Sequence, residues 1–239
     1  MLSRDEYLAA WSRWHGGTDP ADSRLVTGWL SLAYALAVPL ARLSPLVATG
    51  LGLVVAVAAI GPALAGGGWL VATGLLIGLS GLLDSLDGAL AIAGGRASRR
   101  GFVLDSAVDR LTEVAYALAF WAAGAPGWLA AAFGALCWLP DYLRARAGQA
   151  GVSETGAISV WERPTRVAMA GFSLGGAGVV AALDVTDVLV TAGAAVGCLL
   201  GVVGTAQLGV QLRRALGDDA RQRPADLGGP PRAGSCGDS

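Results

Sequence analysis

Seven apolar segments, separated by short polar or glycine-rich stretches, dominate the pattern of hydrophobic and polar positions along the chain. They cover residues 25–41, 45–65, 69–92, 102–123, 127–147, 165–183 and 186–210. A helix needs about 20 apolar residues to cross a bilayer, and the last six segments meet that length. The first segment is shorter and contains Pro39. The pattern predicts an all-α polytopic membrane protein with six transmembrane helices.

Arginines fall in alternate connections between these segments and so predict an orientation. Two connections contain or adjoin arginines, at Arg96, Arg99, Arg100, Arg144, Arg146, Arg163 and Arg166. The connections 65–68, 124–127 and 184–187 contain none. Because arginine-rich loops stay in the cytoplasm, we expect the arginine-bearing connections on that side of the membrane.

The N-terminal arginines fit the same side only if the segment 25–41 does not cross the membrane; a seventh span is the alternative. We therefore expect residues 1–41 to form an amphipathic, interfacial helical segment, anchored by Trp11, Trp14, Trp29 and Tyr34. The six spans form one domain over residues 42–212. The polar residues 213–239, rich in proline and glycine, are expected to be a disordered cytoplasmic tail. The prediction is a multi-pass protein of the cell membrane with both termini in the cytoplasm.

The composition supports a membrane protein and excludes several other classes. Hydrophobic residues make up 54% and charged residues 15% of the chain, whereas a soluble domain carries about 25% charged residues. The net charge of −1 provides no general basic field for nucleic acid. His15 is the only histidine, and Cys137, Cys198 and Cys236 are far apart. These numbers and spacings argue against a histidine-based triad, a zinc site and a disulfide framework.

Four aspartates stand in otherwise apolar sequence and are the main candidates for chemistry. Asp84 and Asp87 are three residues apart near the end of segment 69–92, and Asp105 and Asp109 are four apart near the start of the next segment. Residues at these spacings share one helix face. A short loop joins the two segments, so the helices are expected to be antiparallel neighbours. Both pairs should then converge at the cytoplasmic end of the membrane.

Such a cluster needs compensation for its charge. Each carboxylate within a span costs about 2.5–3.5 kcal/mol on insertion scales, and the chain contains no lysine. Ligation by carboxylates alone selects hard cations, so we expect Mg²⁺ or Mn²⁺. Gly88 and Gly101 allow close approach of a ligand, and the arginine-rich loop suits phosphate. The pattern favours phosphoryl transfer; an ion-coupled transporter is the alternative, because carboxylates in spans also mark ion pathways.

The aspartates belong to a longer pattern that resembles the signature of the CDP-alcohol phosphotransferase family, D-x2-D-G-x2-A-R-x8-G-x3-D-x3-D. Every spacing agrees, at Asp84, Asp87, Gly88, Ala91, Gly101, Asp105 and Asp109. Ile92 stands where the family usually has arginine. The resemblance implies a six-span, usually homodimeric membrane enzyme. It would displace CMP from a CDP-alcohol, commonly CDP-diacylglycerol, with the hydroxyl of a second, small polar alcohol.

The resemblance also implies roles for individual residues. Two divalent ions would be held by Asp84, Asp87, Asp105 and Asp109, and Asp109 would also be the general base. The CDP-alcohol would be bound by Pro45, Thr49, Gly88, Ala91, Gly101, Arg96 and Arg100. Leu46 replaces an asparagine that the family usually has after Pro45. Because of Ile92, a catalytically degenerate member is a further alternative.

Two stretches bear on the acceptor alcohol. "DYLRARAGQAG" (141–151) and "WERPTR" (161–166) resemble segments of the phosphatidylinositol-phosphate synthase branch of that family. The resemblance implies a clamp for an acceptor phosphate formed by Arg144, Arg146, Arg163 and Arg166. Asp141 and Gly148 depart from the branch's usual serine and glutamate. Inositol phosphate is the expected acceptor, and glycerol 3-phosphate or an unphosphorylated alcohol are the alternatives; plain positive-inside charge is the other explanation of these arginines.

Glycines recur at four-residue intervals in two segments. The spacing is seen at Gly74 and Gly78, and again at Gly193, Gly197 and Gly201. Small residues at this spacing let helices approach closely, either within one chain or between subunits. The sequence leaves these two possibilities open.

Overall fold

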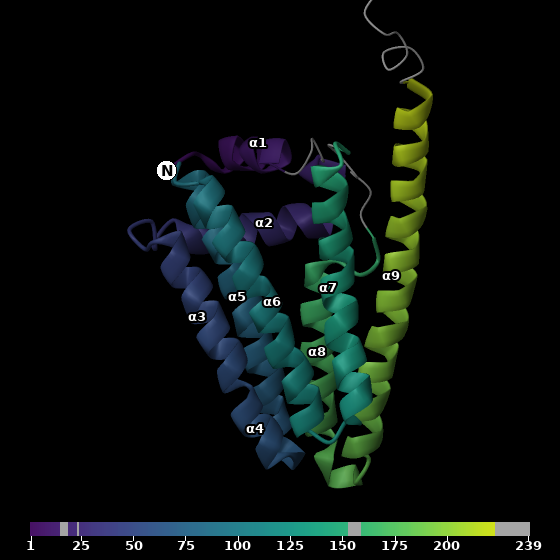
Figure 1. Cartoon of the computed structure of the whole chain (residues 1–239). Helices are drawn as coiled ribbons and strands as arrows, with labels where there is room; N and C mark the ends of the chain where they lie inside the picture. Colours follow the sequence, from purple (N-terminus) through teal and green to yellow (C-terminus); the bar gives the residue numbers. More distant parts are fainter. Residues whose placement is uncertain (15–18, 23, 153–158, 223–239) are drawn as a thin grey trace, which may run out of the picture.

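The protein is a bundle of long helices with two short helices lying across one end (Figure 1). The structure, a computed structural model, describes residues 1–14, 19–22, 24–152 and 159–222. These residues form α-helices and short 3-10 helices and contain no strand. The predicted all-α class is therefore confirmed.

The helices follow the predicted segments closely. The two crossing helices are α1 (Arg4–Trp14) and α2 (Arg24–Ala37). The bundle consists of α3 (Pro45–Ala58), α4 (Ile60–Ala65), α5 (Leu70–Ala93), α6 (Arg99–Ala122), α7 (Gly127–Gln149), α8 (Arg163–Val179) and α9 (Thr186–Gln222). Short 3-10 helices lie at η1 (Pro20–Asp22), η2 (Gly67–Trp69) and η3 (Ala181–Leu183).

Two helix boundaries differ from the expected segments. The segment 45–65 is divided between α3 and α4, because the ring nitrogen of Pro62 has no hydrogen to bond the preceding turn. Helix α9 runs as far as Gln222, beyond the expected end of the span at 210. The remainder of the expected tail, residues 223–239, lies outside the described part of the chain.

Three stretches of helix, among the residues that the structure describes, are long and apolar enough to cross a membrane. They are Pro45–Ala65, Gly67–Ala93 and Thr186–Leu216. Helices α6 and α7 contain several charged side chains, and α8 has 17 residues. Large apolar side chains are also exposed on the bundle, such as Val54 at 64%, Leu75 at 70% and Phe172 at 82%. Exposed apolar surface on this scale suits contact with lipid, whereas the count of six spans stays a prediction.

The N-terminal helices are packed onto the bundle. Tyr7 and Leu30 are buried in one cluster with Leu86 and Leu90 of α5. The backbone amide of Leu2 donates to the carbonyl of Ala93 at 2.8 Å. Since α1 and α2 share this core with the end of α5, they hold a fixed position across that end of the bundle.

Close helix contacts within the chain use all but one of the glycines that the sequence singled out; the exception is Gly78, whose added Cβ would meet no described atom within 4 Å. A Cβ added to Gly74 would lie 2.5 Å from the carbonyl oxygen of Gly171, so α5 and α8 touch through their backbones. On α9, added Cβ atoms would meet side chains of α7 and α8: Ser173 from Gly193, Phe133 from Gly197 and Leu136 from Gly201. Gly74 on α5 and the three glycines on α9 therefore serve packing within one chain.

Candidate metal and phosphate site

Three of the four signature aspartates converge between the end of α5 and the start of α6, although these two helices make little direct contact and both pack against α3. Asp84, Asp105 and Asp109 each place one carboxylate oxygen within 4.8 Å of the others. The turn between the helices is short: α5 ends at Ala93 and α6 begins directly after Ser98. Ser98 Oγ caps α6 by accepting from the Gly101 amide at 3.1 Å.

The fourth aspartate, Asp87, lies one helical turn along α5. Its side chain is buried, at 5% exposure, and interacts electrostatically with Asp84 and Asp105. Its Oδ2 accepts a hydrogen bond from Thr49 Oγ1 of α3 at 2.5 Å. Thr49, which the family resemblance assigns to the CDP-alcohol, is therefore in direct contact with one of the four aspartates.

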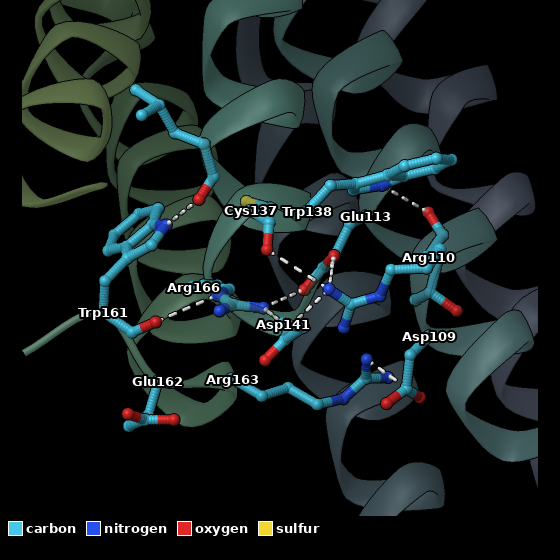
Figure 2. A network of polar contacts seen from close by, with 12 residues as sticks. Asp109, Arg110, Glu113, Cys137, Trp138, Asp141, Trp161, Glu162, Arg163 and Arg166 are labelled. Atoms are coloured by element: carbon cyan, nitrogen blue, oxygen red, sulfur yellow. Dashed lines mark hydrogen bonds and ion pairs between the residues drawn. The ribbon is translucent and has the colours of Figure 1, made fainter. Parts of the chain in front are cut away.

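Arg163, the first residue of α8, is the cation among these carboxylates. Its Nε lies 2.8 Å from Asp84 Oδ2 and its Nη1 lies 2.9 Å from Asp109 Oδ1. Figure 2 shows its side chain extended toward Asp109. Within the described part of the chain, four carboxylates face one guanidinium, so three formal negative charges stay uncompensated. We call Asp84, Asp87, Asp105, Asp109 and Arg163 the carboxylate site.

The carboxylate site fits divalent cations. Its oxygens are close enough for several to bind one ion, and oxygen ligands suit Mg²⁺ and Mn²⁺. Asp105 Oδ1 is buried and has no hydrogen-bond partner within the described residues. A buried carboxylate oxygen without a partner is costly, and a bound cation would satisfy it.

A second polar cluster lies beside the carboxylate site and joins α6, α7 and α8 (Figure 2). Arg166 Nη1 is 2.7 Å from Glu113 Oε1 and 2.6 Å from Asp141 Oδ2. Arg110 Nη1 is 3.0 Å from Glu113 Oε2 and 2.5 Å from Asp141 Oδ2. Arg166 and Glu113 are each only 1% exposed.

The same cluster extends to the segment that precedes α8. Arg144 Nη2 lies 2.5 Å from Glu162 Oε1, and Arg144 Nη1 lies 3.2 Å from Asp141 Oδ1. Glu162 Oε1 also accepts from the Ser159 amide at 2.8 Å. Three arginines thus face three carboxylates, and we call these six residues the ion-pair network: Arg110, Glu113, Asp141, Arg144, Glu162 and Arg166.

The structure separates the four arginines that were predicted to bind the acceptor. Arg163 is in the carboxylate site, while Arg144 and Arg166 are in the ion-pair network. Arg146 is exposed and donates to Gln149 Oε1 at 2.7 Å. Of these four, Arg163 is therefore the one that faces the aspartates.

The predicted CDP-alcohol residues are spread around the same end of the bundle. Pro45 begins α3 one turn before Thr49. Gly88 has open space around it, with no described atom within 4 Å of an added Cβ, and Ala91 is half-buried on the next turn. Arg96 donates to the carbonyl of Ala41 at 2.9 Å, and Arg100 is exposed on the first turn of α6.

Sequence reasoning missed Glu113 and Trp161. Glu113 follows Asp109 by four residues, so the helical spacing that grouped the aspartates would also have found it. Trp161 is fully buried; its Nε1 donates to the carbonyl of Leu136 at 3.2 Å, and its own carbonyl accepts from Arg166 Nε at 3.0 Å. It holds the start of α8 against the bundle, and nothing in the local sequence indicates that role.

An apolar groove of about 880 Å³ leads away from the carboxylate site between α5 and α8. Asp84, Ser85 and Arg163 form its polar end, and Val71 and Val179 line the opposite end. Between them the walls are mostly aliphatic side chains and glycines. The groove therefore joins a charged site to a surface suited to a hydrocarbon chain.

The structure thus combines a helical bundle that has membrane-length helices, a cluster of carboxylates suited to a divalent metal, and an adjoining apolar groove. The family model for CDP-alcohol phosphatidyltransferase matches residues 42–199. The chain belongs to the CDP-alcohol phosphatidyltransferase family.

Two relatives are both named archaetidylinositol phosphate synthase. The protein from Pyrococcus horikoshii is 35% identical over 98 residues, which are 41% of this chain and 52% of that protein. The protein from Aeropyrum pernix is 38% identical over 86 residues, 36% of this chain and 44% of that protein. The match thus spans about half the length of these relatives.

Solved structures of Mycobacterium tuberculosis phosphatidylinositol phosphate synthase (PgsA1) have a similar fold at 26% identity. The structure with CDP-DAG bound has a TM-score of 0.61 and covers 76% of this chain and 94% of that one. The structure with manganese and citrate has a TM-score of 0.60 and covers 74% and 88%. The manganese in that relative and the carboxylate cluster here both support a divalent metal site.

Proposed function

We propose that the protein transfers a phosphatidyl group from CDP-diacylglycerol to inositol phosphate and releases CMP. The observation that carries the proposal is the convergence of the signature aspartates with Arg163 at the polar end of an apolar groove. The names of the archaeal relatives and of PgsA1 support inositol phosphate as the acceptor. Glycerol 3-phosphate is the alternative that the experiment below distinguishes.

The lipid donor would bind in the apolar groove. Its aliphatic walls fit acyl chains, and its polar end brings a diphosphate to Asp84 and Arg163. The structure of PgsA1 with CDP-DAG bound shows that a relative of similar fold binds this class of donor. On this basis the donor enters from the bilayer, while the soluble acceptor comes from the cytoplasm.

The chemistry is a displacement at the phosphorus that carries the diacylglycerol. The acceptor hydroxyl oxygen forms a bond to that phosphorus, and the bond to the bridging oxygen breaks, so that CMP leaves with the electron pair. Asp109 takes the hydroxyl proton, and Arg163 holds phosphate oxygens by its guanidinium. Asp84, Asp87, Asp105 and Asp109 would hold two ions of Mg²⁺ or Mn²⁺. When bound, these ions neutralise the charge that develops on the departing phosphate.

The proposal includes the arrangement in the membrane. Six spans, formed by α3–α4, α5, α6, α7, α8 and α9, would place α1, α2 and the carboxylate site at the cytoplasmic face. The exposed apolar side chains on these helices support that arrangement, and the protein would act as a homodimer. A carrier of ions is less well supported, because residues 42–199 match the family model of a phosphatidyltransferase.

The test is CMP release by the purified full chain in lipid nanodiscs. CDP-diacylglycerol, Mg²⁺ or Mn²⁺, and one acceptor at a time would be supplied: inositol phosphate, glycerol 3-phosphate or inositol. We expect the highest kcat/KM with inositol phosphate and no release after chelation of the metal. A preference for glycerol 3-phosphate would replace the acceptor assignment. Absence of CMP release with every acceptor would overturn the proposed function.

A further inference from the structure

Trp29 of α2 lies at the junction between the apolar groove and the carboxylate site. Its indole is part of the groove wall beside Asp84, Ser85 and Arg163. Its Nε1 donates to Ser85 Oγ of α5 at 2.9 Å, and Ser85 in turn donates to the carbonyl of Gly81 at 3.2 Å. This residue comes from the N-terminal region, outside the part of the chain that the family model matches.

We propose that Trp29 is a donor-binding residue that holds the glycerol region of the CDP-lipid. The inference rests on the proposed function. A donor with its acyl chains in the groove and its diphosphate at Asp84 must pass the polar end of the groove, where Trp29 forms one wall. The glycerol region, which joins the chains to the diphosphate, therefore lies against the indole.

The chemistry of an indole suits this position. Tryptophan combines a large apolar ring with a single hydrogen-bond donor. Here Ser85 takes the donor, which fixes the plane of the ring. The side chain is nevertheless 43% exposed, so part of the ring is open to contact with a ligand. A fixed, partly exposed aromatic face can orient the lipid at little cost in entropy.

The backbone around Trp29 is held in place from several sides. The neighbouring Leu30 is buried against α5 in the cluster that includes Leu86 and Leu90. Further along α2, Tyr34 donates its hydroxyl to the carbonyl of Leu2 at 2.8 Å and stacks on Tyr7. Trp29 therefore has a defined position relative to Asp84, which a donor-binding role requires.

The experiment compares steady-state kinetics of Trp29→Ala, Trp29→Phe and Ser85→Ala with the wild-type full chain in nanodiscs. We expect Trp29→Ala to raise KM for CDP-diacylglycerol about tenfold, the effect of losing one good aromatic contact. Trp29→Phe should have a smaller effect because a ring remains. Ser85→Ala should raise the same KM about two- to threefold, because the indole loses its anchor. KM for the acceptor should stay the same in all three variants.

The control is Trp69→Ala, which removes a tryptophan that is 65% exposed in η2 and outside the groove. Equal changes in Trp69→Ala and Trp29→Ala would overturn the proposal, and so would a Trp29→Ala variant that changes only kcat or the acceptor KM. If Trp29→Ala does not fold, the donor KM of Trp29→Phe and Ser85→Ala decides, and an unchanged value in both refutes it. If the wild-type protein releases no CMP, the proposed function itself is overturned, and the role of Trp29 in donor binding falls with it.

Discussion

The carboxylate site and the ion-pair network lie side by side in the same bundle but differ in net charge: the network is formally neutral, and the carboxylate site is negative. In the network, three arginines face three carboxylates, and the paired guanidinium nitrogens and carboxylate oxygens are 2.5–3.2 Å apart. In the carboxylate site, four aspartates face one arginine, Arg163, among the residues that the structure describes. Charges of both signs offset one another in the network, whereas the excess negative charge of the carboxylate site is relieved by binding a cation. From this difference we infer that the ion-pair network stabilises the fold and that the carboxylate site binds the metal and carries out the reaction.

The largest expected effect is a loss of turnover in a variant that still folds. Asp109→Asn should lower kcat about 10³-fold or more, because the variant loses its general base and one charged metal ligand. The same variant should remain folded in nanodiscs, since no arginine of the ion-pair network contacts Asp109 in the described residues. CMP release measures the first effect, and size-exclusion chromatography the second.

Asp184→Asn is the matched control for that prediction. Asp184 is exposed in the turn before α9 and has a left-handed backbone that asparagine tolerates. Its turnover should equal that of the wild type. An Asp109→Asn variant that retains a tenth of the wild-type kcat would contradict the assignment of the base.

The second prediction concerns stability and has opposite signs in the two clusters. Glu113→Gln leaves Arg166 and Arg110 with one carboxylate fewer in a buried setting and should cost about 3–5 kcal/mol of unfolding free energy. Asp105→Asn removes one of the uncompensated charges and should leave the stability unchanged or higher in metal-free buffer. Thermal unfolding in detergent with chelator measures both. Destabilisation of similar size in both variants would remove the distinction between the clusters.

A third, smaller effect tests the anchor that holds Arg163 in place. A Cβ on Gly204 would clash with the side chain and the backbone of Trp161, so Gly204→Ala should destabilise the protein by about 1–3 kcal/mol. Gly209→Ala on the same helix is the control, because no described atom lies within 4 Å of its added Cβ. That control should be neutral or slightly stabilising. Equal melting temperatures for the two variants would show that Trp161 does not anchor α8 through α9.

The smallest expected effect concerns the departure from the family signature. Ile92→Arg restores the usual residue on the last turn of α5, where Ile92 is half-buried against the N-terminal cluster. Because Arg163 already supplies a guanidinium to the carboxylate site, kcat/KM should stay within about twofold of the wild type or rise. Complete loss of CMP release in this variant would mean that the site has been remodelled around isoleucine.

Much of this architecture was predictable from local spacing. The three- and four-residue intervals put each aspartate pair on one helix face, and the short loop after Ala93 brings the end of α5 close to the start of α6. The expectation that the two helices are direct neighbours was wrong, because α5 packs mainly against α3 and α8, and α6 against α3 and α7. The convergence of Asp84 with Asp109 followed from these two facts, and the structure confirms it. The helical class followed in the same way from the length of the apolar segments.

Other features depend on contacts between distant parts of the chain. Asp141 pairs with Arg110, 31 residues earlier, and with Arg166, 25 residues later, and no local pattern specifies such partners. The arginines therefore looked alike in sequence, although the structure puts Arg163 and Arg166 in different clusters. The charges that build these clusters also lower the hydropathy of α6 and α7, so the apolar length of these helices says less about crossing a membrane.

The central claim is that the four aspartates form a divalent metal site, and Mn²⁺ binding measured by electron paramagnetic resonance tests it directly. The purified wild-type chain should remove free Mn²⁺ from solution with saturation at two ions per chain. Asp105→Asn should bind at least about tenfold more weakly, because it loses a charged ligand with a buried, unpartnered oxygen. Equal binding by the wild type, Asp105→Asn and Asp184→Asn, or no saturable binding by the wild type, would contradict the account.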